Sequence, residues 1–178
     1  MKTIALVCVA IYLIFSLASS LCYHGSYRTS EESSVVPVAF YVYYSRTFKA
    51  LQQNQPFIFD VVETNYGNGY DKNTGVFTAP SAGLYAFSWT IHAAGTHQAG
   101  SSGQYGEMVA VLEQNGVAKG SIYADTETEY DDDSGTGFVI LAVSTRDTFQ
   151  IVSQTEGQGA FYSTMSNGKT SFSGFRIA

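Results

Sequence analysis

The segment from Leu84 to Ile91 alternates strictly between the two sides of an extended chain. One side carries Tyr85, Phe87, Trp89 and Ile91, and the other carries Leu84, Ala86, Ser88 and Thr90. A period of two, with aromatic and β-branched residues on one side, is the pattern of a half-buried strand. This segment therefore predicts a sheet that buries one face.

Four further segments have strand patterns. Residues 57–62 alternate, residues 138–143 are continuously apolar as in a strand covered on both faces, and the other two are 148–153 and 171–177. The last is expected to bend at Gly174.

Turn sequences separate these segments at 72–75, 115–116 and 167–168. The last two are Asn-Gly pairs, which supply the positive φ angles of a tight hairpin. No segment combines a sustained period of 3.6 residues with helix caps. The sequence therefore predicts an antiparallel all-β domain, either a sandwich or a barrel.

The N-terminus has the parts of a secretory signal peptide. Lys2 precedes an apolar run over residues 4–17, and small residues follow up to Ser20. The run is shorter than the roughly 20 residues that a membrane span needs. We expect a secreted, extracellular protein without membrane insertion, with a signal peptide at 1–20, a short flexible leader at 21–34 and one domain at 35–178.

Cysteine usage and charge exclude two classes of protein. Cys8 would leave with the signal peptide, so Cys22 would be the single cysteine of the mature chain, and a disulfide framework is excluded. Cys22 could link two chains, or be removed by cleavage after it, and the sequence leaves both readings open. The net charge is −6 and the basic residues are scattered singly, so we expect no nucleic-acid partner.

The residue patterns of common enzymes are not found in the sequence. His92 and His97 form no HExxH arrangement, and residues 100–103 do not form a Gly-x-Ser-x-Gly elbow. Two carboxylates for glycoside hydrolysis could still meet in space. An enzyme is therefore the weaker hypothesis, and we assign no catalytic residue.

One acidic segment holds six of the fifteen carboxylates of the chain. They are Asp125, Glu127, Glu129, Asp131, Asp132 and Asp133. Oxygen ligands concentrated in a loop suit calcium, although the spacing is not that of an EF-hand. By composition alone, a solvated acidic loop is the commoner alternative.

A longer spacing pattern resembles the globular head domain of complement C1q. The matching positions are Phe59, Asn65, Tyr70, Phe77, Gly83, Tyr85 and Phe87. Trp89 replaces the Phe or Tyr of the last position, and Arg146-Asp147 replaces a usual Gly-Asp pair, so we expect that loop to differ in shape. Over 35–178 the resemblance implies a C1q-like head domain, a ten-stranded antiparallel jelly-roll sandwich of the C1q/tumour necrosis factor type. It also implies assembly as a homotrimer.

The resemblance also implies a candidate metal site. In adiponectin-like heads, two aspartates eight positions apart flank a loop near the calcium site, and Asp125 and Asp133 have that spacing here. These two residues are the candidate metal ligands, with calcium as the candidate cofactor.

The order of a signal peptide and a lone head domain resembles the secreted head-only members of the family that are abundant in molluscs. Our first hypothesis is therefore a non-enzymatic, lectin-like innate-immune protein for pattern recognition of microbial surface carbohydrate or lipopolysaccharide. The alternatives are a cerebellin- or adiponectin-like ligand or organiser that binds a cell-surface receptor, and an acidic calcium-binding matrix protein. A disulfide-linked trimer through Cys22 would favour the organiser.

Aromatic and polar residues outside the core pattern could stack on a sugar, although ordinary surface residues are the commoner interpretation. They are Tyr105, Tyr123, Tyr130, Tyr162 and His97, and none is assigned to a site.

Overall fold

The computed structural model describes residues 37–93, 107–126, 132–157 and 159–178. The chain divides into two compact units, Met1–Val35 and Val36–Ala178, and the second unit contains all the described strands. Strands are the only regular elements among its described residues, and these residues include no helix that could cross a membrane.

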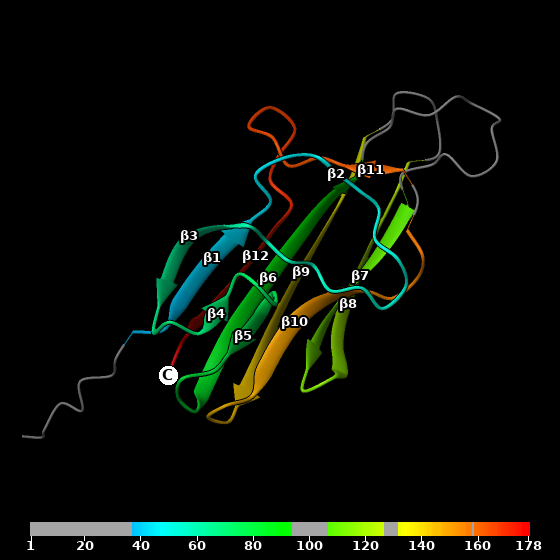
Figure 1. The fold of residues 1–178 in the computed structure, drawn as a ribbon. Helices are drawn as coiled ribbons and strands as arrows, with labels where there is room; N and C mark the ends of the chain where they lie inside the picture. Colours follow the sequence, from blue (N-terminus) through cyan, green and yellow to red (C-terminus); the bar gives the residue numbers. More distant parts are fainter. Residues whose placement is uncertain (1–36, 94–106, 127–131, 158) are drawn as a thin grey trace, which may run out of the picture. The chain divides into compact units, whose positions relative to one another are not determined.

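Twelve strands are found in the described residues (Figure 1). They are β1 (Ala39–Tyr43), β2 (Phe48–Lys49), β3 (Val61–Tyr66), β4 (Tyr70–Asp71), β5 (Val76–Thr78), β6 (Gly83–Ala93), β7 (Glu107–Gln114), β8 (Val117–Asp125), β9 (Asp133–Val143), β10 (Thr148–Ser153), β11 (Ala160–Phe161) and β12 (Ser171–Arg176). The expected number is ten, and three of the twelve, β2, β4 and β11, are only two residues long.

The strands form two antiparallel sheets. The seven-stranded sheet has the order β2–β11–β6–β12–β1–β3, and β9 pairs with β6 along its whole length. The five-stranded sheet has the order β4–β5–β10–β7–β8. Two packed antiparallel sheets with non-sequential neighbours are the arrangement of a jelly roll, so the predicted fold class is confirmed.

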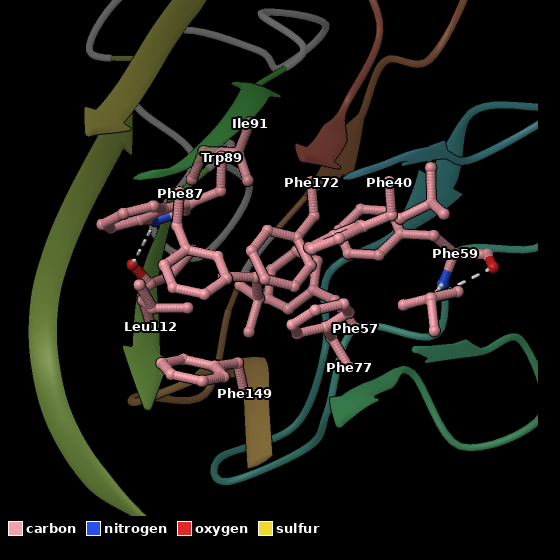
Figure 2. Close-up of a cluster of buried hydrophobic side chains, with 14 of the residues drawn as sticks. Phe40, Phe57, Phe59, Phe77, Phe87, Trp89, Ile91, Leu112, Phe149 and Phe172 are labelled. Carbon is pink, nitrogen blue, oxygen red and sulfur yellow. Dashed lines mark hydrogen bonds between the residues drawn. The ribbon is translucent and has the colours of Figure 1, made fainter. Parts of the chain in front are cut away.

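Aromatic side chains from the two sheets meet in the core. Phe40 of β1 stacks on Phe77 of β5 with ring centroids 4.4 Å apart, and Phe87 of β6 stacks on Phe149 of β10 at 4.3 Å. Figure 2 shows these rings packed together with Phe172 between the strands. Each fully buried ring stabilises the fold by roughly 1.5–3 kcal/mol relative to an exposed one.

The alternation of residues 84–91 correctly predicts which side of β6 is buried. The side chains of Tyr85, Phe87, Trp89 and Ile91 are all buried in this core. Phe77 and Tyr70, which belong to the same spacing pattern, are buried as well. The aromatic run is therefore core and not a binding stripe.

Trp89 is held by a hydrogen bond and by two glycines. Its Nε1 donates to the carbonyl oxygen of Ala110 on β7 at 3.1 Å. A Cβ atom added at Gly137 would lie 2.6 Å from Cη2 of the indole, and one at Gly120 would lie 2.8 Å from the same atom. The indole thus occupies the space of two absent side chains, which accommodates a larger ring than the usual Phe or Tyr.

The strand predicted at residues 57–62 is wrong in its position, because β3 spans Val61–Tyr66. The alternation nevertheless predicts burial correctly, since Phe57 and Phe59 are buried while Ile58 is exposed. The Phe57 amide donates to the carbonyl oxygen of Ile151 on β10 at 2.8 Å. After β1 and β2, the chain therefore passes along the five-stranded sheet before it reaches β3.

The apolar run 138–143 is correctly predicted as part of a strand, β9. The prediction that both faces are covered is wrong for the single chain, because Phe138 is 62% exposed and Ile140 is 51% exposed. Phe138 pairs with Ser88 and Ile140 pairs with Ala86, and both partners lie on the outer side of β6. Apolar residues on this face are therefore exposed in the single chain.

The loop before β10 places Arg146 at a φ of 73°, a region that favours glycine. Asp147 accepts hydrogen bonds from Asn115 Nδ2 at 2.9 Å, from the Ser144 amide at 2.8 Å and from Gln114 Nε2 at 2.8 Å. These bonds, that of Asn115 foremost, lower the pKa of the Asp147 carboxyl. Asp147 therefore stabilises the folded state above its unfolded pKa, and this contribution is lost as the pH falls through its lower folded pKa.

We expect Gly137→Ala to destabilise the domain by about 1–3 kcal/mol, because the added methyl group overlaps the Trp89 indole. Chemical denaturation followed by circular dichroism measures the change. In a Trp89→Phe background the ring is smaller, so the same substitution should cost clearly less. An equal cost in both backgrounds would show that the indole is not the source of the effect.

Candidate functional site

The two predicted metal ligands lie close together where β8 ends and β9 begins. Asp133 Oδ2 accepts a hydrogen bond from the backbone amide of Asp125 at 2.9 Å. Residues 127–131 of the acidic segment lie outside the described residues. In the part of the chain that is described, no group of three or more His, Cys, Asp or Glu residues is arranged to hold a metal ion. Calcium binding therefore remains a prediction.

Glu107 lies directly opposite Asp125 in the pairing of β7 with β8. Like charges in opposite positions of a ladder are destabilising. Tyr123 lies beside them, and the pKa of its hydroxyl is raised by desolvation and then by the carboxylates of Glu107 and Asp125. This end of β8 is thus an acidic corner formed by Glu107, Asp125 and Asp133.

On the outer face of the seven-stranded sheet, the neighbouring strands β6, β9 and β12 carry four large exposed apolar side chains. They are Leu84 on β6, Phe138 and Ile140 on β9, and Phe175 on β12. Ala86 of β6 pairs with Ile140 on one side and Phe175 on the other. We call these four residues the outer apolar patch, and such a patch typically marks an interaction surface.

The same face is polar toward the end of β6. Thr90 Oγ1 lies 3.0 Å from Thr136 Oγ1, and His92 Nδ1 lies 2.7 Å from Ser134 Oγ. Desolvation lowers the pKa of His92. Its ring also packs on Gly168, where an added Cβ would lie 2.6 Å from Nε2. His92 is therefore a packed strand residue and not a solvated loop histidine.

A second exposed surface lies along β3. In the described residues this strand pairs with β1 alone, so it is an edge strand of the seven-stranded sheet. Tyr66 is 65% exposed. A hollow of about 310 Å³ runs along this strand, and its described lining consists of Glu63, Thr64, Asn65 and Tyr66. Sequence reasoning missed this feature, because the polar residues of β3 hide its strand pattern.

Of the remaining aromatic and histidine candidates, the structure describes Tyr162. Tyr105, Tyr130 and His97 lie outside the described residues. Tyr162 is half-buried, and its backbone amide donates to the carbonyl oxygen of His92 at 2.8 Å.

The fold is the antiparallel jelly roll of the C1q and tumour necrosis factor type. The family model of the C1q domain matches residues 39–177, and the chain belongs to the C1q domain family.

One curated relative is the collagen alpha-1(X) chain of Mus musculus, which is 28% identical over 141 residues. The match covers 79% of this chain and 18% of that protein, so the chain spans about a fifth of the length of this relative.

The solved structures that share the fold include two with similar TM-scores. The globular domain of zebrafish complement 1qA protein superposes with a TM-score of 0.60 at 20% identity, and the match covers 79% of this chain and 98% of that one. Eiger TNF from S. frugiperda superposes with a TM-score of 0.61 at 12% identity, over 80% of this chain and 93% of that one.

Proposed function

We propose that this protein is a secreted, non-enzymatic recognition protein that binds microbial surface carbohydrate or lipopolysaccharide as a homotrimer. The observation that carries the proposal is the outer apolar patch on a chain of the C1q domain family. The signal-peptide pattern at residues 1–20 supports secretion.

The outer apolar patch supports assembly because its exposure is costly in water. Covering apolar surface stabilises an interface by roughly 25 cal/mol for each Å² removed from water. A second copy of the chain presents the same sheet and the same apolar side chains, and copies that close into a ring leave no patch uncovered. The resemblance to the C1q and tumour necrosis factor type favours three copies.

Assembly into a trimer raises the overall affinity of a weak binding site. Three copies of one site on a repetitive surface raise the overall affinity by about 10²–10⁴ over a single contact, provided that all can engage. Microbial polysaccharides and lipopolysaccharide layers are repetitive in this sense. A multivalent recognition protein therefore fits both the exposed patch and the expected ligand class.

A receptor-binding organiser is the second candidate, and Cys22 would support it if it joins trimers covalently. A calcium-dependent matrix protein is the third, supported by the acidic segment and by the match to a collagen chain. In both of these alternatives the chain has the same fold and assembles as a trimer. They differ from the first in predicting no binding to polysaccharides.

The experiment for the first proposal measures mass and binding together. Light scattering of the mature protein should give about three times the chain mass, and Phe138→Asp should give single chains because the carboxylate cannot be covered. The variant should also bind an immobilised microbial polysaccharide about 10²–10⁴-fold more weakly.

Val117→Asp is the matched control for this experiment, because Val117 is exposed on β8 of the other sheet. It should leave both mass and binding unchanged. A stable wild-type monomer would contradict the assembly. A trimer that binds no polysaccharide would instead favour the receptor-binding or matrix alternatives.

We also propose that Asp125 and Asp133 bind calcium. The proposal is supported by the hydrogen bond from the Asp125 backbone amide to Asp133 Oδ2, which puts the Asp133 carboxylate next to the backbone of Asp125, and by carboxylate oxygens being the ligands that calcium prefers.

A chelator should therefore lower the melting temperature of the wild-type protein, because a ligand that binds only the folded state stabilises it. The double variant Asp125→Ala with Asp133→Ala should melt at the same temperature with and without chelator. Glu156→Ala, an exposed carboxylate elsewhere, should keep the wild-type shift. Identical wild-type melts in both conditions would refute the calcium site.

A further inference from the structure

We propose that the edge strand β3, together with Tyr41 of β1, forms a binding site for a neutral pyranose ring. This inference rests on the proposed carbohydrate recognition and assigns it a place. We call the residues Tyr41, Glu63, Thr64 and Tyr66 the tyrosine edge.

The strand register places the tyrosine edge on the outer face. Tyr41 lies opposite Thr64, and Ala39 lies opposite Tyr66. Tyr41 and Tyr66 are therefore diagonal neighbours, a separation that aromatic side chains span. The intervening pair, Phe40 and Asn65, points to the other side, where Phe40 is buried in the core.

An irregularity in the pairing adds Glu63 to this face. The register shifts between Tyr41 and Val42, which leaves Glu63 without a partner of its own on β1. A bulge of this kind re-aims a side chain and is frequent beside functional sites. Tyr43 Oη donates to Glu63 Oε2 at 3.4 Å, which ties the carboxylate to the outer face of β1.

Neighbouring contacts hold the site in place without using its ring faces. Lys169 Nζ lies 4.7 Å from the centre of the Tyr43 ring, and that ring lies 5.6 Å from the ring of Tyr41. Asn65 Nδ2 donates to the Tyr70 carbonyl oxygen at 2.9 Å, and Asn65 Oδ1 accepts from the Tyr70 amide at 3.0 Å. β3 is thus anchored on its inner side next to Tyr66.

The chemistry of the tyrosine edge matches a pyranose. A sugar ring has an apolar C–H face, which an exposed Tyr66 ring can stack against, and a rim of hydroxyl groups. The carboxylate of Glu63 accepts hydrogen bonds from hydroxyl groups, and such charge-assisted bonds are stronger than neutral ones.

Charge favours a neutral sugar over an anionic one. Glu63 contributes a carboxylate to the site, and the chain carries a net charge of −6. An anionic sugar would meet repulsion here. The ligand we infer is therefore a neutral hexose unit of a polysaccharide.

The tyrosine edge lies at the end of the sheet away from β9. The outer apolar patch lies on β6, β9 and β12, whereas β3 is at the end of the sheet beyond β12 and β1. Phe138 and Ile140 on β9 are separated from Tyr66 by three strands, while Phe175 is separated from it by Ala39 of β1. The proposed site is therefore compatible with a neighbouring copy that covers Phe138 and Ile140.

The test uses the full secreted protein and immobilised mannan as a neutral polysaccharide, with alginate as an anionic one. Wild type should bind mannan and bind alginate more weakly. Tyr66→Ala and Glu63→Gln should each weaken mannan binding at least about tenfold, as loss of a central contact does. Met165→Ala and Glu156→Gln, two exposed residues elsewhere, are the matched controls and should bind as wild type.

Trp89 fluorescence checks that each variant is folded, and Glu63→Gln keeps the test valid if Tyr66→Ala does not fold. Wild-type binding that both variants retain would overturn the tyrosine edge and leave the proposed function standing. Tighter binding of alginate than of mannan would overturn the neutral ligand. Binding of neither polysaccharide would count against the proposed function itself and the site with it.

Discussion

The stacking of Phe87 on Phe149 joins the two sheets at the middle of the fold, and much of the structure depends on it. Phe87 lies on β6, which pairs with β9 along one edge and with β12 along the other. The inner side of β6 therefore anchors the core through Phe87 and Trp89. Its outer side contributes Leu84 and Ala86 to the region of the outer apolar patch, so one strand sets both the packing inside the chain and the surface it offers outside.

The same constraint explains how much of the fold could be predicted from the sequence. The alternation of residues 84–91 correctly predicts the buried side of β6, because every second side chain contacts the aromatic core. The Asn-Gly pair at 115–116 is also correctly predicted as a turn, since Asn115 and Gly116 both take positive φ angles. β3 could not be found in this way, because Glu63, Thr64 and Asn65 carry no apolar alternation.

The exposure of β9 shows a further limit of sequence patterns. A continuous apolar run predicts cover on both faces, but it does not say whether the cover comes from the same chain. Phe138 and Ile140 lie on the outside of this chain, and a sequence pattern cannot distinguish that place from a second buried face. The closeness of Asp125 and Asp133 follows from their positions at the adjoining ends of β8 and β9. Sequence spacing does not determine which ligand binds there, because that depends on which other side chains lie near the two aspartates.

The central claim of this account is that copies of the chain cover the outer apolar patch. Hydroxyl-radical footprinting of the protein in solution tests it directly, because labelling follows the solvent exposure of each side chain. We predict that Phe138 is labelled nearly as weakly as Phe87, which is buried in the core, while Tyr66 is labelled strongly. Labelling of Phe138 several times faster than that of Phe87 would contradict the account.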